Sequence, residues 1–315
     1  MNRRANVFPG YENHCMFYMQ GDSEELKKAK ESQLQDLLGY ELPENIIMED
    51  RMIPSGEADR KIKLRIFTPI YESRELPLIL ESHGGGWVGG NLDIDNYRCI
   101  ELAKRIPAIV VSVEYRLAGE GVCYPEPLKD CLAAYLWMAE HAVELGGDAR
   151  LLGMHGTSAG GNLTAGLALY LRDHGGPKCA LAVLNCAVLH LNITEMSSYF
   201  QNEELSLVHG EYAKDTEATY LGHYLGKPLP EYAFPGHAVN LRGLCPHFVL
   251  AAEYDTLRDS SVRYAVRLMD TGVPCELLVA PRVCHGFTSV HHPYTEQIHD
   301  LIATSFRREF GMLDQ

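Results

Sequence analysis

"MHGTSAGGN", residues 154–162, places Ser158 between glycines that lie two positions before and two positions after it. The apolar run "LLGMHG" (151–156) precedes this serine, and a helical pattern over about 160–173 follows it. A Gly-x-Ser-x-Gly segment between a strand and a helix predicts a nucleophile elbow, because the glycines remove side chains that would clash with the sharp bend. The five residues alone are also compatible with a glycine-rich turn that contains an incidental serine.

Apolar runs of strand length alternate with helical patterns along most of the chain. This alternation predicts right-handed βαβ units and therefore an α/β fold, with a mostly parallel central sheet and helices on both faces. Near-continuous Val, Ile, Leu and Ala are typical of buried parallel strands. The expected strands are 62–69, 76–83, 108–115, 151–156, 179–189, 247–253 and 275–281, and the expected helices are 97–105, 125–144, 160–173, 258–271 and 294–309.

Two segments depart from this alternation. Residues 1–45 are polar and helix-prone, and residues 191–240 are long, tyrosine-rich and poor in strand patterns. An insertion of that length between core strands is typical of a lid or a pocket wall. We therefore expect N-terminal cap helices over 1–50 and a catalytic domain over 51–315, with a cap insertion at about 191–235.

A second glycine cluster, "SHGGGWVGG" (82–90), follows the expected strand at 76–83. Acyl transfer forms a tetrahedral oxyanion, which needs several backbone N–H groups directed at one point. Gly84 and Gly85 can present such groups, and the amide of Ala159 adds a third donor. A phosphate-binding loop is the alternative, but the cluster has no Gly-Lys-Ser/Thr ending.

A serine nucleophile needs a base, and the base needs an acid that orients it. His285 follows the last expected strand, and Asp255 follows the strand at 247–253. Asp259 competes with Asp255, but it falls inside the next helical pattern. The order Ser, Asp, His along the chain is the order used by strand–elbow–helix hydrolases. Carboxyl ends of parallel strands share one edge of a sheet, so these side chains are expected to meet there.

Residues 60–310 resemble the hormone-sensitive-lipase-like branch of the α/β-hydrolases, also called family IV bacterial esterases. This resemblance implies the α/β-hydrolase fold, short-chain carboxylester hydrolysis without a cofactor or metal, and a helical cap. It makes Ser158 the nucleophile, His285 the base and Asp255 its partner. The motifs that carry it are "HGGGWVGG", "VEYRLAGE", "YPEPLKD", "GTSAGG", "PHFVLAAEYDTLRD" and "HGF", and it implies oxyanion donors at Gly84, Gly85 and Ala159.

The chain departs from the family pattern in three places. Thr157 stands where the family usually has an acidic residue before the nucleophile, which puts the hydrogen bonds that support the elbow in question. "RLAGE" (116–120) has Gly119 in place of a proline, and the loop before Tyr124 is one residue longer.

The pocket is less well defined by the sequence. Aromatic and aliphatic side chains near the glycine cluster and in the insertion are candidates for an acyl or alcohol pocket: Trp87, Val88, Tyr199 and Phe200. Cys284, beside His285, is interpreted as a small buried hydrophobic residue.

Composition narrows the classes of partner and compartment. A formal net charge of −14 over 315 residues disfavours nucleic acid and anionic membranes, which would repel the chain. Nine cysteines without a Cys-x-x-Cys pair indicate reduced thiols in a cytoplasmic protein. We see no signal-peptide pattern and no apolar run of membrane-spanning length. A monomer and a homodimer are both compatible with the sequence.

Other functions stay open at this stage. The same triad serves an amidase, a lactonase or a deacetylase acting on a small metabolite. An inactive ligand-binding receptor is disfavoured because such relatives tend to lose the histidine that is present here. A metal hydrolase built on "VHHPY" (290–294) is weaker, because adjacent histidines rarely bind one ion.

Overall fold

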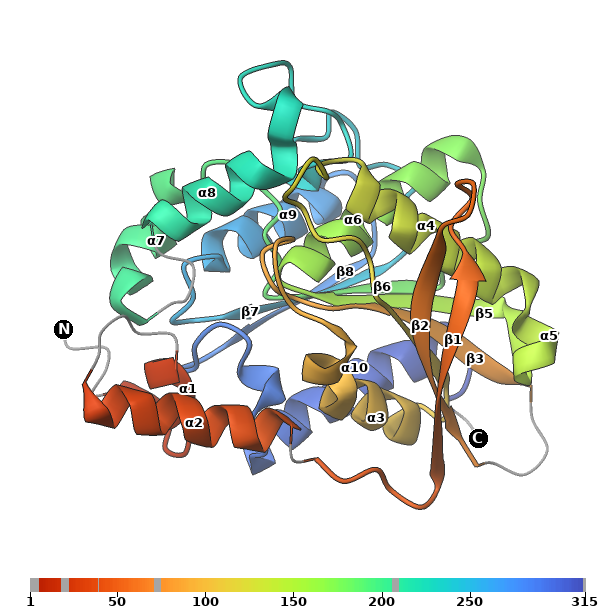
Figure 1. Ribbon diagram of the computed structural model, residues 1–315, viewed down its shortest axis with the longest axis horizontal. Helices are drawn as coiled ribbons and strands as arrows, with labels where there is room; N and C mark the ends of the chain where they lie inside the picture. The colour runs from red at the N-terminus through yellow and green to blue at the C-terminus, as the bar shows by residue number, and fades with distance from the viewer. Residues whose placement is uncertain (1–5, 18–22, 39, 71–74, 206–209, 314–315) are drawn as a thin grey trace.

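An eight-stranded sheet crosses the middle of the molecule, and helices lie on both of its faces (Figure 1). The computed structural model describes residues 6–17, 23–38, 40–70, 75–205 and 210–313. The strand order is β1-β2-β4-β3-β5-β6-β7-β8; β1 and β2 pair antiparallel, and the strands from β3 to β8 pair in parallel. The strands are β1 Ile46–Pro54, β2 Lys61–Pro69, β3 Leu76–Ser82, β4 Ile109–Val113, β5 Gly147–Thr157, β6 Leu181–Asn185, β7 His247–Ala252 and β8 Cys275–Ala280.

The helices form two layers around this sheet and two further groups outside the layers. One face carries α4 (Glu126–Glu140), α6 (Ala159–His174) and α9 (Arg258–Asp270), and the other carries α3 (Asn96–Arg105) and α10 (Pro293–Glu309) (Figure 1). Within the described ranges, no helix is both long enough and apolar enough to cross a membrane. The remaining α-helices are α1 Glu12–Phe17, α2 Glu24–Leu38, α5 Ala142–Leu145, α7 Ser197–Asn202 and α8 Gly210–Leu221.

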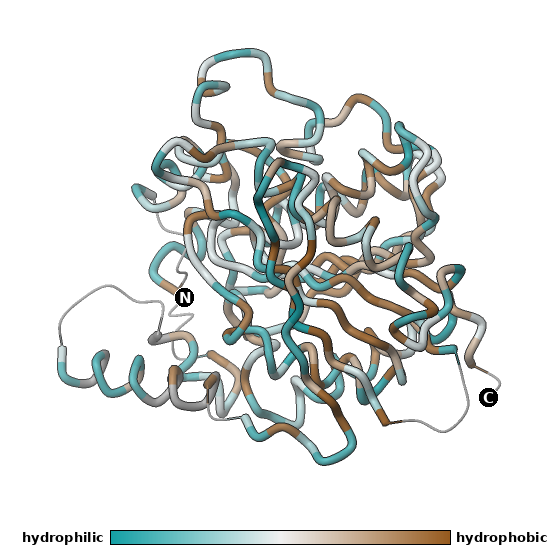
Figure 2. Tube along the Cα trace, turned by 45° about the vertical axis from the view of Figure 1, so that its right-hand side comes forward, coloured by the Kyte–Doolittle hydropathy of each residue, from teal (hydrophilic) through white to brown (hydrophobic). Residues whose placement is uncertain are grey.

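The core consists of two apolar layers, one on each face of the sheet. Successive side chains of a strand point to opposite faces. Along β3, Leu78 and Leu80 therefore join the cluster that contains α4, α6 and α9, whereas Ile79 joins the cluster with α3 and α10. The central strands are correspondingly hydrophobic along their length in Figure 2. Burial on both sides explains why these strands have near-continuous apolar sequences.

The predicted mostly parallel sheet with helices on both faces is confirmed. β1 is absent from the strands expected from the sequence; it is an edge strand with exposed residues along most of its length, including Glu49 and Asp50. Charged, exposed edges are a common way to prevent sheets from pairing with other chains, and they hide the apolar alternation of a strand. The expected strand at 179–189 ends at Asn185.

The two segments outside the βαβ pattern lie at the same end of the molecule. The N-terminal helices α1 and α2 lie beside the layer of α3 and α10, and α7 and α8 lie beside α9, all on the left of Figure 1. One cavity is lined both by Leu34 of α2 and by residues of α8. The parallel strands end at this cavity, which places the expected site residues there.

Candidate active site

Ser158 occupies the bend between β5 and α6 with φ 57° and ψ −118°, a conformation that side-chain-bearing residues rarely adopt. The flanking glycines make the bend sterically possible. A Cβ on Gly160 would overlap the carbonyl oxygen of Ser82, and a Cβ on Gly156 would overlap the carbonyl oxygen of Gly160. The elbow therefore packs directly against the end of β3, which leads into the glycine cluster at 83–86.

Hydrogen bonds from β6 hold this elbow. The Ser158 amide donates to the carbonyl oxygen of Asn185 (2.9 Å), and the Asn185 side-chain amide donates to Thr157 Oγ1 (3.2 Å) and Thr288 Oγ1 (2.8 Å). The Thr157 hydroxyl thus accepts a supporting hydrogen bond in the position where the resembling family has a carboxylate. Asn185 also ties the elbow to the segment that follows His285.

The glycine cluster approaches the elbow closely. A Cβ built on Gly84 would lie 3.5 Å from Ser158 Cβ and 3.3 Å from the Thr157 carbonyl oxygen. Gly85 has φ +128°, and a side chain there would overlap Gly89. Ala159 begins α6, so its amide is at a helix N-terminus, where backbone N–H groups and the helix dipole favour an anion. The three expected oxyanion donors therefore lie around the serine.

His285 and Asp255 form a hydrogen-bonded pair at the ends of the neighbouring strands. His285 Nδ1 lies 2.7 Å from Asp255 Oδ2, and Asp255 Oδ1 accepts from the Leu257 amide (3.0 Å). Asp259 instead lies in the first turn of α9, where it accepts from the Ser198 amide. Ser158, His285 and the glycines at 84–86 all line one cavity of about 290 Å³.

Comparison with known proteins agrees with this geometry. Residues 79–289 match the family model described as having the alpha/beta hydrolase fold. The chain belongs to the α/β-hydrolase family.

Relatives of this α/β-hydrolase include several esterases. Carboxylesterase NlhH of Mycobacterium tuberculosis is 35% identical over 255 residues, which cover 79% of this chain and 77% of the relative. Esterase LipI of the same species is 36% identical over 228 residues, covering 72% of this chain and 71% of the relative. Among solved structures, a bacterial heroin esterase has a TM-score of 0.85 and 30% identity over 97% of this chain and 98% of that chain. The chain is accordingly a carboxylic ester hydrolase.

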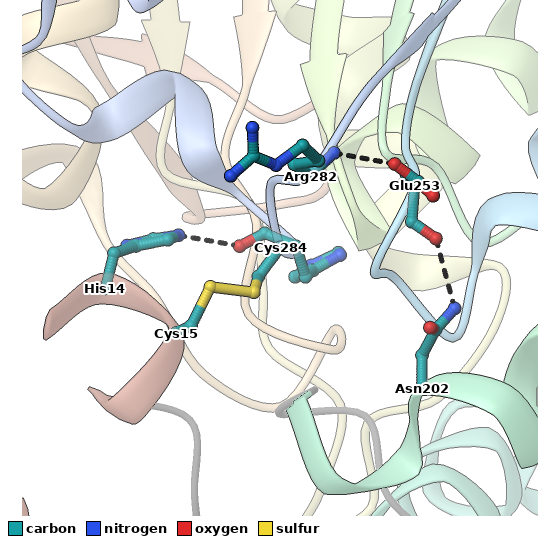
Figure 3. The surroundings of a disulfide bond; sticks show 7 residues. His14, Cys15, Asn202, Glu253, Arg282 and Cys284 are labelled. Carbon is teal, nitrogen blue, oxygen red and sulfur yellow. Dashed lines mark hydrogen bonds between the residues drawn. A yellow bond between two sulfur atoms is a disulfide. The ribbon is translucent and has the colours of Figure 1, made fainter. Parts of the chain in front are cut away.

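The N-terminal segment of this α/β-hydrolase holds the loop that carries His285. His14 Nε2 lies 2.8 Å from the carbonyl oxygen of His285, and Cys15 forms a disulfide with Cys284 (Figure 3). Burial lowers the pKa of His14 to about 4, so near neutral pH its uncharged ring donates this hydrogen bond. One short helix, α1, therefore makes a covalent and a polar attachment next to the expected base.

This disulfide corrects two expectations from the sequence. The interpretation of Cys284 as a small hydrophobic residue was wrong, and the expectation of reduced thiols was wrong for Cys15 and Cys284. The two cysteines are 269 residues apart and no local spacing connects them, so only the fold brings them together. The other seven cysteines are free.

A buried thiol behind the histidine was not anticipated either. Cys186, Asp255 and His285 have potential ligand atoms within 4.8 Å of one another, a grouping that could hold a metal ion. Burial, together with the Asp255 carboxylate, raises the pKa of the Cys186 thiol, so it stays protonated and is a poor metal ligand. The donor set therefore does not fit a metal centre.

The cavity wall differs from the expected pocket. Trp87 lines the cavity, but its ring is stacked on the Tyr220 ring with the ring centroids 4.3 Å apart, and its Nε1 donates a hydrogen bond to Asn162 Oδ1. The structure does not bring the other three candidates to the cavity lining: Val88 packs against the core, Tyr199 is buried and donates to Glu203, and Phe200 is 71% exposed. One face of α8 forms part of the wall instead, and the only sequence signal of this helix was its place in the strand-poor insertion.

Proposed function

We propose that this enzyme hydrolyses short-chain acyl esters of small molecules through Ser158, His285 and Asp255. The observation that carries the proposal is the 2.7 Å hydrogen bond between His285 and Asp255, made where His285 and Ser158 line one cavity. With Nδ1 bound to Asp255, proton transfer falls to His285 Nε2. The cavity of about 290 Å³ is near the lower end of ligand pockets, which favours small esters over long acyl chains.

The reaction would proceed in two acyl transfers. Ser158 Oγ attacks the ester carbonyl carbon while His285 takes its proton, and the amides of Gly84, Gly85 and Ala159 stabilise the oxyanion. His285 then protonates the leaving alcohol as the C–O bond breaks, which leaves an acyl-serine. Water repeats the sequence, releasing the carboxylic acid and returning the proton to Ser158. Asp255 holds the imidazole in the required tautomer and stabilises its cation.

Variants of Ser158 and of two neighbouring acids, Asp255 and Asp259, test the triad. Ser158→Ala and Asp255→Asn are expected to lower kcat for p-nitrophenyl acetate by roughly 10³-fold or more. Asp259→Asn, four residues beyond Asp255 and in the first turn of α9, is expected to retain activity. An organophosphonate should add its mass at Ser158. Full activity in Ser158→Ala, or a greater loss in Asp259→Asn than in Asp255→Asn, would contradict the assignment.

Chain length and bond type are tested with one substrate series. Activity is expected to be highest for p-nitrophenyl acetate and butyrate and to fall steeply towards palmitate. The same triad can cleave amides, lactones and acetylated metabolites, so acetanilide, a γ-lactone and an acetylated sugar belong in the series. Faster turnover of any of these than of the acetate ester would replace the ester proposal.

We also propose that 1–50 and about 191–235 form a cap on a catalytic domain spanning 51–315. Leu34 of α2 and Tyr212 of α8 support this division, since both line the cavity above the elbow. A cytoplasmic location remains part of the proposal and is supported by the seven free cysteines. To test this location, the thiols of the protein are trapped directly in cells and then counted. The count also shows whether the Cys15–Cys284 disulfide is present there.

A further inference from the structure

One face of α8 lies directly above the proposed oxyanion loop. Tyr212, Ala213, Thr216 and Glu217 follow one another at helical spacing, and all four line the cavity. The contact with the loop is close, since a Cβ on Gly86 would lie 2.9 Å from the Tyr212 hydroxyl. With a short acyl group at Ser158, the larger alcohol portion of an ester is the part that reaches this face.

Glu217 is the unusual residue of this face. Its side chain is 5% exposed; one carboxyl oxygen accepts from the Asn192 amide (3.3 Å), and the other, Oε1, is buried without a hydrogen-bond partner. The neighbouring Thr216 hydroxyl, in contrast, already donates to the Tyr212 carbonyl oxygen. Among the described residues, Glu217 Oε1 is therefore a buried acceptor without a partner at normal hydrogen-bond geometry.

The charge of Glu217 is also uncompensated. Asp95 and Arg98, two other charged residues of the cavity wall, form an ion pair with each other. Among the described residues, no Lys, Arg or His forms an ion pair with Glu217. Burial, with a smaller contribution from the nearby Glu195 carboxylate, raises the pKa of Glu217 to about 7, and backbone hydrogen bonds from Asn192 and Ile193 oppose this shift. A carboxyl group in this state gains most from a ligand that brings a cation.

We propose that Glu217 makes this site select esters whose alcohol portion carries an alkylammonium group. The inference rests on the proposed ester hydrolysis and names its substrate class. An ammonium N–H would pair with Oε1 and neutralise the buried charge, whereas a neutral ester would leave that oxygen without a partner. Sites with buried polar groups discriminate strongly against analogues that lack the matching group. The net charge of −14 also raises the local concentration of cations around the enzyme.

Three phenyl acetates that differ only in their para substituent test this class: aminomethyl, hydroxymethyl and ethyl. The readout is the ratio of kcat/KM for the ammonium ester to that for the ethyl ester at pH 8, because a general loss of folding or triad geometry cancels in the ratio. The wild type is expected to favour the ammonium ester at least ten-fold, and Glu217→Gln, which keeps the shape of the side chain, is expected to bring the ratio close to one. Glu211→Gln is the matched control, because Glu211 lies on the same helix, is exposed and is not among the residues that line the cavity.

Each outcome either supports or overturns the inference. A ratio that is the same in the wild type and in Glu217→Gln overturns it, as does a hydroxymethyl ester that is preferred as strongly as the ammonium ester. If the ethyl ester is hydrolysed in a Ser158-dependent way in those cases, the proposed function survives and only the substrate class fails. If the wild type hydrolyses none of the three esters, the proposed function fails together with the inference.

Discussion

Removing the Cys15–Cys284 disulfide is expected to destabilise the enzyme and to slow its chemistry. The bond joins residues 269 positions apart, so in the unfolded chain it closes a loop of nearly the whole protein. The chain-entropy relation gives about 5.6 kcal/mol for such a loop at 25 °C, and losses of about 2–5 kcal/mol are typical when native disulfides are removed. For a chain of 315 residues, an unfolding entropy of ~2.1 cal/mol/K per residue turns that range into a fall in Tm of roughly 3–8 °C.

The site gives this perturbation a second readout. Cys284 is adjacent to His285, and α1 also binds the His285 carbonyl through His14 (Figure 3). Cys15→Ser breaks the covalent attachment without changing any residue of the proposed triad. We expect kcat to fall by several-fold with little change in KM, because the substitution loosens the base and leaves the cavity wall formed by α8 in place.

Scanning fluorimetry with and without a phosphine reductant, thiol titration in denaturant and steady-state kinetics measure these effects together. The oxidised wild type should show seven titratable thiols and the reduced protein nine. Reductant should lower the Tm of the wild type, should not change that of Cys15→Ser, and should leave Cys275→Ser, which removes a free thiol, as sensitive as the wild type. Nine thiols before reduction, or equal Tm values for wild type and Cys15→Ser, would refute the reasoning.

Two further predictions concern acid stability and the elbow. The pKa of His14 is about 4 in the folded state, below its unfolded value of 6.5, so the unfolded state binds the proton first as pH falls. The contribution of His14 to the free energy of unfolding is therefore complete above pH 6.5 and drops by about 2 kcal/mol at pH 5. Urea unfolding of the wild type and of His14→Gln measures this difference. Gly160→Ala is expected to abolish activity and lower Tm, since its methyl group would overlap the Ser82 carbonyl oxygen; an active, stable variant would show that the bend can relax.

Features that depend on residues close together in the chain could be predicted from the sequence. The strained bend at Ser158 requires small residues at 156 and 160, so it leaves a short readable motif. Buried parallel strands likewise leave apolar runs in the sequence. Their carboxyl ends share one edge of the sheet, which predicted that Asp255 and His285 would meet, and the two side chains form a 2.7 Å hydrogen bond. The catalytic roles of these residues remain the proposal that the variants above test.

The pocket and the N-terminal attachment depended on the tertiary structure. Tyr199 and Phe200 had the aromatic character expected of a pocket, but the packing of α8 places Glu217 among the residues that line the cavity instead. Cys15 and Cys284 carry no spacing signal, because a contact across 269 residues is fixed by how the whole chain folds. The sequence by itself determined the buried parallel strands and the elbow, since both leave patterns among neighbouring residues. Only the folded chain decided which side chains line the cavity and which cysteines pair, because those contacts join elements that the sequence keeps far apart.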